Sequence, residues 1–172
     1  MQRVISFIVS NQPGVLSRIS GLISRRGFNI DSLTVGVTSN PDLSRITIVM
    51  DAEDAVIEQV VKQFDKLLDV KAIKEIPGDN GIFREIALIK IGTEGVDKKT
   101  LMADVESRRG IVLDIGEKSL TIQLYGTINY INQSVELLRK YTIIELARTG
   151  MVALEMGDTQ LYDSQAAAMQ KI

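Results

Sequence analysis

A Pro-Gly loop near the start of the chain carries the residue types best suited to bind a small ligand. The run Asn11-Gln12-Pro13-Gly14-Val15-Leu16 follows an apolar segment and precedes residues with helical spacing. The first N–H groups of a helix lack partners within the helix and attract negative charge. Gly14 has no Cβ, so a ligand can approach the backbone closely, and the Asn11 amide is both a donor and an acceptor.

This pattern predicts a site for a free amino acid. The N–H groups of Gly14, Val15 and Leu16 would bind its carboxylate, and Asn11 would bind either the carboxylate or the ammonium group. The same residues also suit an ordinary Pro-Gly turn in which Asn11 caps the helix, and spacing alone does not separate the two interpretations.

Other polar positions are weaker candidates. Asn29 stands at the entrance of an expected strand, where it is a turn residue or a ligand contact. The carboxylates of Asp51, Glu53 and Asp54 gather at a helix start, where the helix dipole stabilises them without a metal ion. Gly92-Thr93-Glu94-Gly95 lacks the Lys-Ser/Thr pair of a phosphate-binding loop. Four arginines suit either a solvated surface or a phosphate or protein partner: Arg84, Arg108, Arg109 and Arg148.

The composition excludes several classes of function. None of the 172 residues is cysteine or histidine, so disulfides, thiolate nucleophiles and the usual general base and metal ligand are absent. The 20 basic and 22 acidic residues form no basic block, so we expect no nucleic-acid partner. No apolar run reaches the ~18 residues that span a membrane, and no signal peptide precedes the first strand. We therefore expect a cytoplasmic protein with no membrane contact and no metal site.

The apolar periodicity of the first half predicts the order strand, helix, strand, strand, helix, strand. Strands are expected at 4–9, 30–38, around Ile46 to Met50, and at 70–76. Helices are expected from Val15, ending at Gly27, and from Glu53 or Asp54 to Asp69. This order is typical of a ferredoxin-like, or split βαβ, domain.

The second half repeats this order. Strands are expected at 83–91, 111–115, 120–125 and 143–148, and helices at 97–108 and 128–141. Two arginines followed by glycine end the first helix of each half, at residues 25–27 and 108–110, which supports an internal duplication. We therefore expect an α+β protein with two tandem ferredoxin-like βαββαβ domains, at 1–77 and 83–157. A linker at 78–82 joins them, and a tail at 158–172 forms a short helix or stays mobile.

Several segments together resemble a known family. The segments at 11–18 (NQPGVLSR), 27–35 (GFNIDSLTV) and 43–48 (LSRITI) resemble the ACT domain of the small regulatory subunit of acetohydroxyacid synthase, also called acetolactate synthase. The similarity continues through 84–91 (REIALIKI), Arg108 to Gly110 and 147–150 (ARTG), and covers residues 1 to 155.

The resemblance implies a regulatory, non-catalytic subunit in valine, leucine and isoleucine biosynthesis. Such subunits activate a separate catalytic subunit and confer feedback inhibition by a branched-chain amino acid, usually valine. The resemblance implies no cofactor in this chain, and thiamine diphosphate, Mg and FAD on the catalytic partner. The second domain has no clear Asn-Pro-Gly loop, so we expect it to contact the catalytic subunit.

The resemblance also implies a homodimer through the ACT domains, with the amino acid bound between two chains. One chain would contribute Asn11, Gly14, Val15 and Leu16, and the other Asn29 and Ile30. Val35 would line the apolar end of the site, which selects a branched side chain. A ligand that bridges two chains stabilises the dimer arrangement that it binds better.

Two other functions remain open at this point. The first is a stand-alone ACT-type amino-acid sensor that acts on another target protein. Direct action on DNA is disfavoured, because no helix-turn-helix with a basic recognition helix is visible. The second is a small enzyme on a ferredoxin-like scaffold that uses Asp, Glu or Lys.

Overall fold

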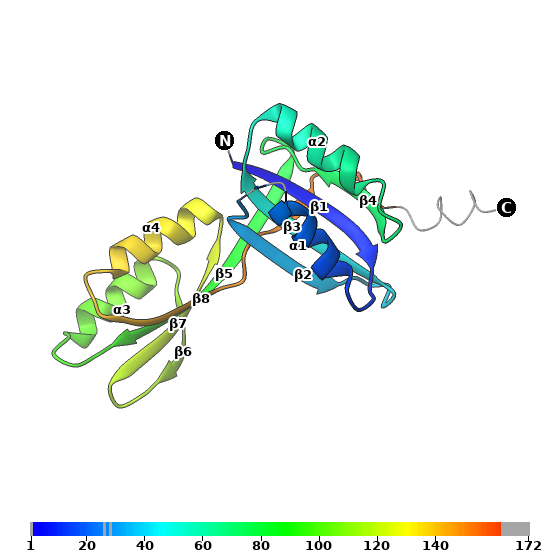
Figure 1. The fold of residues 1–172 in the computed structure, drawn as a ribbon. Coiled ribbons are helices and arrows are strands. Elements are labelled where there is room, and N and C mark those ends of the chain that lie inside the picture. Colours follow the sequence, from blue (N-terminus) through cyan, green and yellow to red (C-terminus); the bar gives the residue numbers. More distant parts are fainter. Residues whose placement is uncertain (1, 26, 28, 163–172) are drawn as a thin grey trace. The chain divides into compact units, whose positions relative to one another are not determined.

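The chain folds into two compact units. The computed structural model describes residues 2–25, 27 and 29–162. The first unit comprises Met1–Ile82 together with Met151–Ile172, and the second comprises Phe83–Gly150 (Figure 1). The sequence places residues 151–157 in the second domain, whereas in the structure the chain returns to the first unit at Met151. Of the expected tail, only residues 158–162 are described, and the alanine run at 166–168 lies outside the described residues.

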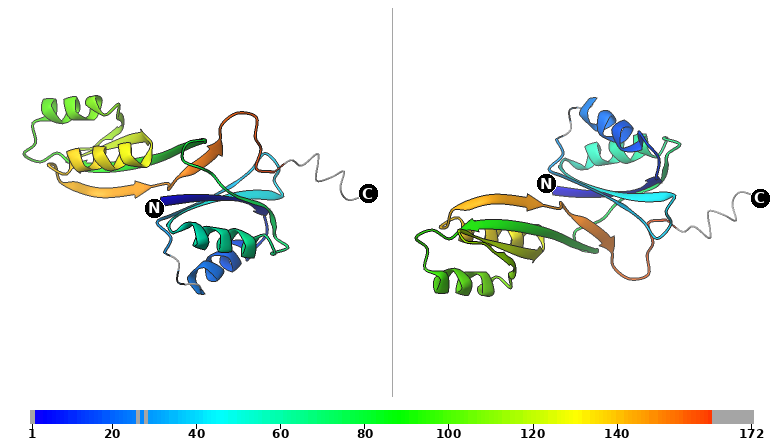
Figure 2. Two further views of the ribbon diagram at one scale, coloured as in Figure 1. Left: turned by 90° about the horizontal axis from the view of Figure 1, so that it is seen from above. Right: turned by 90° about the horizontal axis from the view of Figure 1, so that it is seen from below.

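The first unit contains a four-stranded antiparallel sheet with helices on one face. Its strands β1 (Gln2–Ser10), β2 (Ser32–Val37), β3 (Leu43–Asp51) and β4 (Val70–Glu75) are arranged in the order β2-β3-β1-β4. Helices α1 (Val15–Arg25) and α2 (Asp54–Phe64) cover one face, and the returning segment from Met151 lies on the other (Figure 2). The order of elements confirms the predicted βαββαβ fold.

Alternation along the central strands builds the core of this unit. The odd-numbered residues of β1 from 5 to 9 and the even-numbered residues of β3 face the helices and are buried, as the period of two along a strand requires. The rings of Phe7 in β1 and Phe64 in α2 meet edge to face, with centroids 5.3 Å apart. Gly27 has a φ of +72°, which confirms that it ends the first helix in the left-handed conformation. The main core residues are Ile5, Phe7, Val9, Ile19, Ile23, Ile46, Ile48, Val60 and Phe64.

The second unit repeats the order of elements. Strands β5 (Gly81–Gly92), β6 (Ile111–Ile115), β7 (Ser119–Gly126) and β8 (Ile143–Arg148) are arranged in the order β6-β7-β5-β8. A short strand, β9 (Val152–Glu155), pairs with β5 and, like the first two residues of β5, belongs to the first unit. Helices α3 (Lys98–Ser107) and α4 (Ile128–Leu138) pack on the face that carries Ala87, Ile89 and Ile91. Side chains at Asp97 and Thr127 cap the two helices, which explains where each begins.

An ion pair joins the two neighbouring strands β5 and β8. The Nε and Nη2 groups of Arg148 donate to the two carboxylate oxygens of Glu85, each at 2.7 Å, and Nη1 donates to Asn132 at 2.9 Å. The Glu85 side chain is only 4% exposed. Hydrogen bonding to Glu85 raises the pKa of Arg148, so the guanidinium stays charged. From the sequence, Arg148 is expected to be solvated or to bind a partner. The structure instead shows a bidentate ion pair between Arg148 and Glu85.

We predict that Arg148→Ala destabilises the second unit by about 3 kcal/mol, because it leaves the buried Glu85 carboxylate without its partner. Three of the four tyrosines lie in this unit, at 125, 130 and 141, so tyrosine fluorescence during urea unfolding measures the change. Lys118→Ala is the matched control. It removes an ion pair to Glu94 in which both side chains are more than 70% exposed, so we expect a change below about 0.5 kcal/mol. Equal effects of the two substitutions would contradict the prediction.

Candidate functional site

The β1–α1 loop has the backbone geometry that the Pro-Gly pattern predicts. Gly14 has a φ of +86°, which an L side chain rarely adopts, and its carbonyl accepts the N–H of Arg18 at 3.0 Å. A Cβ at Gly14 would meet no atom within 4 Å, so the space above this backbone is open. The Val15 side chain is buried in the core and fixes the helix start, whereas Leu16 is 42% exposed.

Asn11 fastens this loop to the β2–β3 turn. Its Nδ2 group donates to the Pro41 carbonyl at 2.8 Å, and its Oδ1 accepts the Ser44 hydroxyl at 3.1 Å. Its backbone N–H donates to the Asp42 carbonyl at 2.7 Å. An amide has two N–H groups and two acceptor positions, so each end keeps one for a ligand. Sequence reasoning missed this structural role, because the partners lie some thirty positions away and no local motif marks them.

The second set of predicted contacts lies around the start of β2. Asn29 is exposed, and its Nδ2 group donates to the Asp31 carboxylate at 3.3 Å, which holds the side chain beside the strand entrance. Ile30 is partly buried against the core of the first unit. Val35 lies midway along β2 and is 42% exposed.

Within one chain the structure separates these two sets. The loop of Asn11 is bonded to Asp42, just before β3 begins, whereas the N–H of Asp31 donates to Val49 near the end of β3. Asp42 and Val49 are seven positions apart, or about 23 Å along an extended strand. A single amino acid cannot span this distance, so one chain cannot supply both sets of contacts to one ligand.

Strand β2 also forms one edge of the sheet. Only β3 pairs with it among the described strands, so its other side presents unpaired backbone groups. Its helix-side residues Val35 and Val37 are 42% and 61% exposed. An apolar edge strand of this kind is a template for pairing with a second chain.

In the acidic group at residues 51, 53 and 54, Asp54 has a structural partner. The Asp54 carboxylate accepts a hydrogen bond from Arg3, which also donates to Glu75 Oε2 at 2.8 Å. These two carboxylates raise the pKa of Arg3. Among the residues that the structure describes, no group of three or more His, Cys, Asp or Glu could hold a metal ion. No helix in the described part of the chain is long and apolar enough to span a membrane.

Comparison with known proteins identifies the two halves of the chain. Residues 5–72 match the model of the AHAS small subunit-like ACT domain, and residues 84–157 match that of the small subunit of acetolactate synthase. The fold and the β1–α1 loop thus define a protein of the ACT-domain class.

Relatives along nearly the whole chain define the family more closely. The chain is 40% identical over 158 residues to a probable acetolactate synthase small subunit of Archaeoglobus fulgidus, covering 92% of this chain and 99% of the relative. It is 39% identical to the isozyme 3 small subunit of Escherichia coli, with 92% and 98% coverage. The crystal structure of the acetolactate synthase small subunit from Thermotoga maritima superimposes with a TM-score of 0.85 at 36% identity, over 92% of this chain and 99% of that chain. This chain belongs to the family of acetolactate synthase small subunits, as its sequence motifs predict.

We predict that Gly14→Ala destabilises the first unit by about 1 kcal/mol, because alanine is strained at a φ of +86° even where there is room for its Cβ. Gly21→Ala is a matched control, since Gly21 lies inside α1 without a positive φ and with equal room. We expect it to stabilise the protein by about 0.5–1 kcal/mol, because alanine favours helix. Thermal unfolding followed by circular dichroism measures both. The prediction fails if the two substitutions shift the midpoint in the same direction.

Proposed function

We propose that this protein activates acetohydroxyacid synthase and confers feedback inhibition by a branched-chain amino acid, with valine as its effector. The observation that carries the proposal is the separation of the two sets of site residues to opposite ends of β3. That arrangement suits a ligand site that two chains complete together.

Pairing of two β2 edges would bring the separated sets together. In a two-fold dimer the same strand of each chain meets its copy in antiparallel orientation. The β1–α1 loop lies at the end of β2 where Val37 faces Ser44, and Asn29 lies at the start of β2. Antiparallel pairing therefore places the loop of one chain beside Asn29 and Ile30 of the other.

Each part of a bound valine then has a partner. Its carboxylate binds the N–H groups of Gly14, Val15 and Leu16 at the helix start, where the Val15 N–H exchanges its long hydrogen bond to the Gln12 carbonyl (3.4 Å) for the ligand. The remaining N–H and acceptor positions of Asn11 bind the carboxylate or the ammonium group. Val35 lines the apolar end against the isopropyl group. Because the ligand contacts both chains, it stabilises the dimer arrangement that fits it best.

We assign the contact with the catalytic subunit to the second domain. The sheet face turned away from α3 and α4 carries Ile86, Leu88 and Tyr125, which are 40%, 40% and 56% exposed. Apolar side chains grouped on one sheet face favour a protein partner. In this proposal thiamine diphosphate, Mg and FAD belong to the catalytic partner, this chain holds no cofactor, and the complex acts in the cytoplasm.

Complementation between two variants tests whether the site is shared between chains. We expect Asn11→Ala and Asn29→Ala each to abolish valine binding as homodimers. After unfolding and refolding as an equal mixture, half of the dimers carry both variants, and each of these has one intact site. Calorimetry should then find about a quarter of the valine sites of the unmodified protein, since a two-fold interface uses the same residues twice.

A control variant and a contradicting outcome complete this test. Ser44→Ala removes the hydroxyl that bonds Asn11 Oδ1 but leaves the ligand-facing groups, so it should bind valine with nearly unchanged affinity. If the mixture of variants binds no valine, each site is built within a single chain and the shared site is disproved.

Reconstitution with the catalytic subunit tests the function itself. We expect the protein to raise acetolactate formation by the purified catalytic subunit and to make the activity sensitive to valine. Asn11→Ala should keep the activation and lose the sensitivity, because activation is assigned to the second domain. A protein that binds valine but alters no property of the catalytic subunit would instead be a stand-alone ACT-type sensor.

A further inference from the structure

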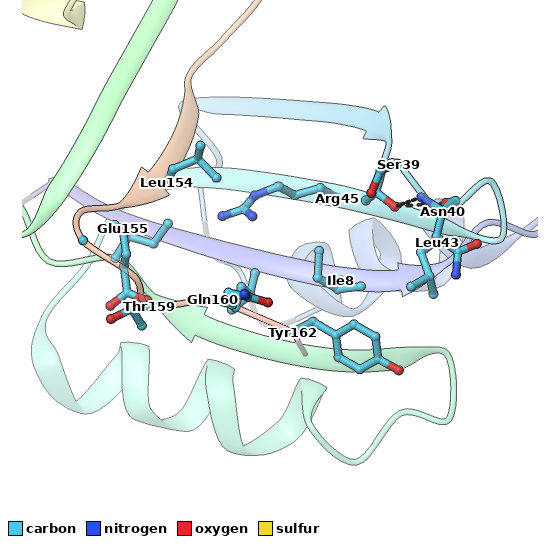
Figure 3. Close-up of a pocket in the computed structure, with 14 residues that line it drawn as sticks. Ile8, Ser39, Asn40, Leu43, Arg45, Leu154, Glu155, Thr159, Gln160 and Tyr162 are labelled. Atoms are coloured by element: carbon cyan, nitrogen blue, oxygen red, sulfur yellow. Dashed lines mark hydrogen bonds between the residues drawn. The ribbon is translucent and has the colours of Figure 1, made fainter. Parts of the chain in front are cut away.

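A cavity lies on the face of the first sheet that is turned away from its helices. Its volume is about 390 Å³, within the range of small-molecule sites. The sheet contributes Ile8, Leu43 and Arg45, the β2–β3 turn contributes Thr38 to Asn40, and the returning segment closes the other side (Figure 3). The residues from that segment are Leu154, Glu155, Gly157 and Thr159 to Tyr162.

Arg45 carries a polar atom that lacks a hydrogen-bond partner in this cavity. Its Nε atom is buried without a hydrogen-bond partner among the residues that the structure describes. Its side chain extends over the sheet toward Leu154 (Figure 3). Burial lowers the pKa of Arg45, and the negative charge of Glu155 opposes this shift only in part.

Glu155 is the carboxylate whose charge acts on Arg45, and it forms an ion pair with Lys74. Glu155 also lines the cavity, but its Oε1 accepts the Lys74 ammonium at 2.7 Å, and its side chain is only 7% exposed. Lys74 thus neutralises Glu155, and the three groups together leave one positive charge at Arg45. A half-buried guanidinium with an unpartnered Nε is stabilised by an anion that accepts its N–H groups in pairs.

We propose that this cavity is a second effector site, which binds a small monocarboxylate with an apolar body through Arg45. A carboxylate matches the paired N–H groups of the guanidinium. The single surplus charge and the nearby Glu155 disfavour a dianion such as phosphate. The apolar part of the ligand would lie against Ile8, Leu43 and Leu154.

The site is physically joined to the proposed amino-acid site through the β2–β3 turn. Thr38, Ser39 and Asn40 line the cavity, and the next two residues of the turn, Pro41 and Asp42, bond Asn11 through their carbonyls. A ligand that orders this turn therefore alters the position of the Asn11 loop. Binding at the two sites is then coupled, and each ligand changes the affinity of the other by the same factor. This coupling, unlike the cavity itself, rests on the proposed function.

Isobutyrate is the probe for direct binding, because it has a carboxylate and an apolar body but no ammonium group. We expect the full chain to bind it with millimolar affinity in an NMR titration. Shifts should appear at residues 38–45 and 154–162. Arg45→Gln should weaken binding at least tenfold, and Arg84→Gln, which changes an exposed arginine of the second unit, should leave it unchanged. Inorganic phosphate should shift these signals much less.

Three outcomes would overturn the site: no shifts at tens of millimolar isobutyrate, shifts confined to residues 11–16 and 29–35, or equal affinity in Arg45→Gln. If Arg45→Gln does not fold, Arg45→Lys serves instead, since it keeps the charge and loses the paired N–H groups, and we expect several-fold weaker binding.

Calorimetry with both ligands tests the coupling. Saturating isobutyrate should change the affinity for valine by about fivefold or more, and Arg45→Gln should abolish this change. Persistence of the change in Arg45→Gln would indicate competition at the valine site and overturn the coupling. Isobutyrate binding at Arg45 without any valine binding would refute the proposed function and leave the cavity site standing.

Discussion

The first unit covers only one face of its sheet with helices, and its other features follow from this constraint. A sheet with one bare face and a free edge must pair or cover both, or it exposes apolar side chains and unpaired backbone groups. The bare face receives residues 151–162, where the Met151 N–H donates to the Ser32 hydroxyl at 3.0 Å and Lys74 pairs with Glu155. The sheet has two edges in the described chain, at β2 and β4, and the proposed dimer forms at the β2 edge.

Strand β3 contributes side chains to both faces of the sheet, because successive residues of a strand point to opposite sides. Ser44 points to the helix side and bonds Asn11, whereas the next residue, Arg45, points to the opposite side and into the cavity. The turn that precedes the strand contributes to both places. Any change of position in this short segment therefore affects both faces, which is the physical basis of the proposed coupling between the cavity and the Asn11 loop.

Local patterns in the sequence predict most of the fold. Apolar periodicity places every strand and helix of the two repeats, and Gly27 and Asp97 mark a helix end and a helix start as expected. The return of the chain to the first unit at Met151 is not predicted, because the short strand β9 carries no strong pattern and its place depends on a face created by residues 2 to 76. Likewise, the partners of Asn11 and Arg148 are distant in sequence. The sequence alone therefore indicates that these two side chains are available for a ligand or partner, whereas the fold places internal partners beside them.

The contrast between the two repeats explains why only the first is assigned an amino-acid site. In the second unit the Asp97 carboxylate accepts the N–H groups of Lys99 and Thr100 at the start of α3. The Thr100 hydroxyl and these two N–H groups lower the pKa of Asp97, so an internal carboxylate already occupies the position that suits an anion. At the corresponding place in the first unit stands Gly14, which has no side chain, and the space above it is open. A ligand carboxylate at α1 would therefore take the place that Asp97 fills at α3. In the proposed function, the duplicated fold keeps one helix start for its own cap and offers the other to an external anion.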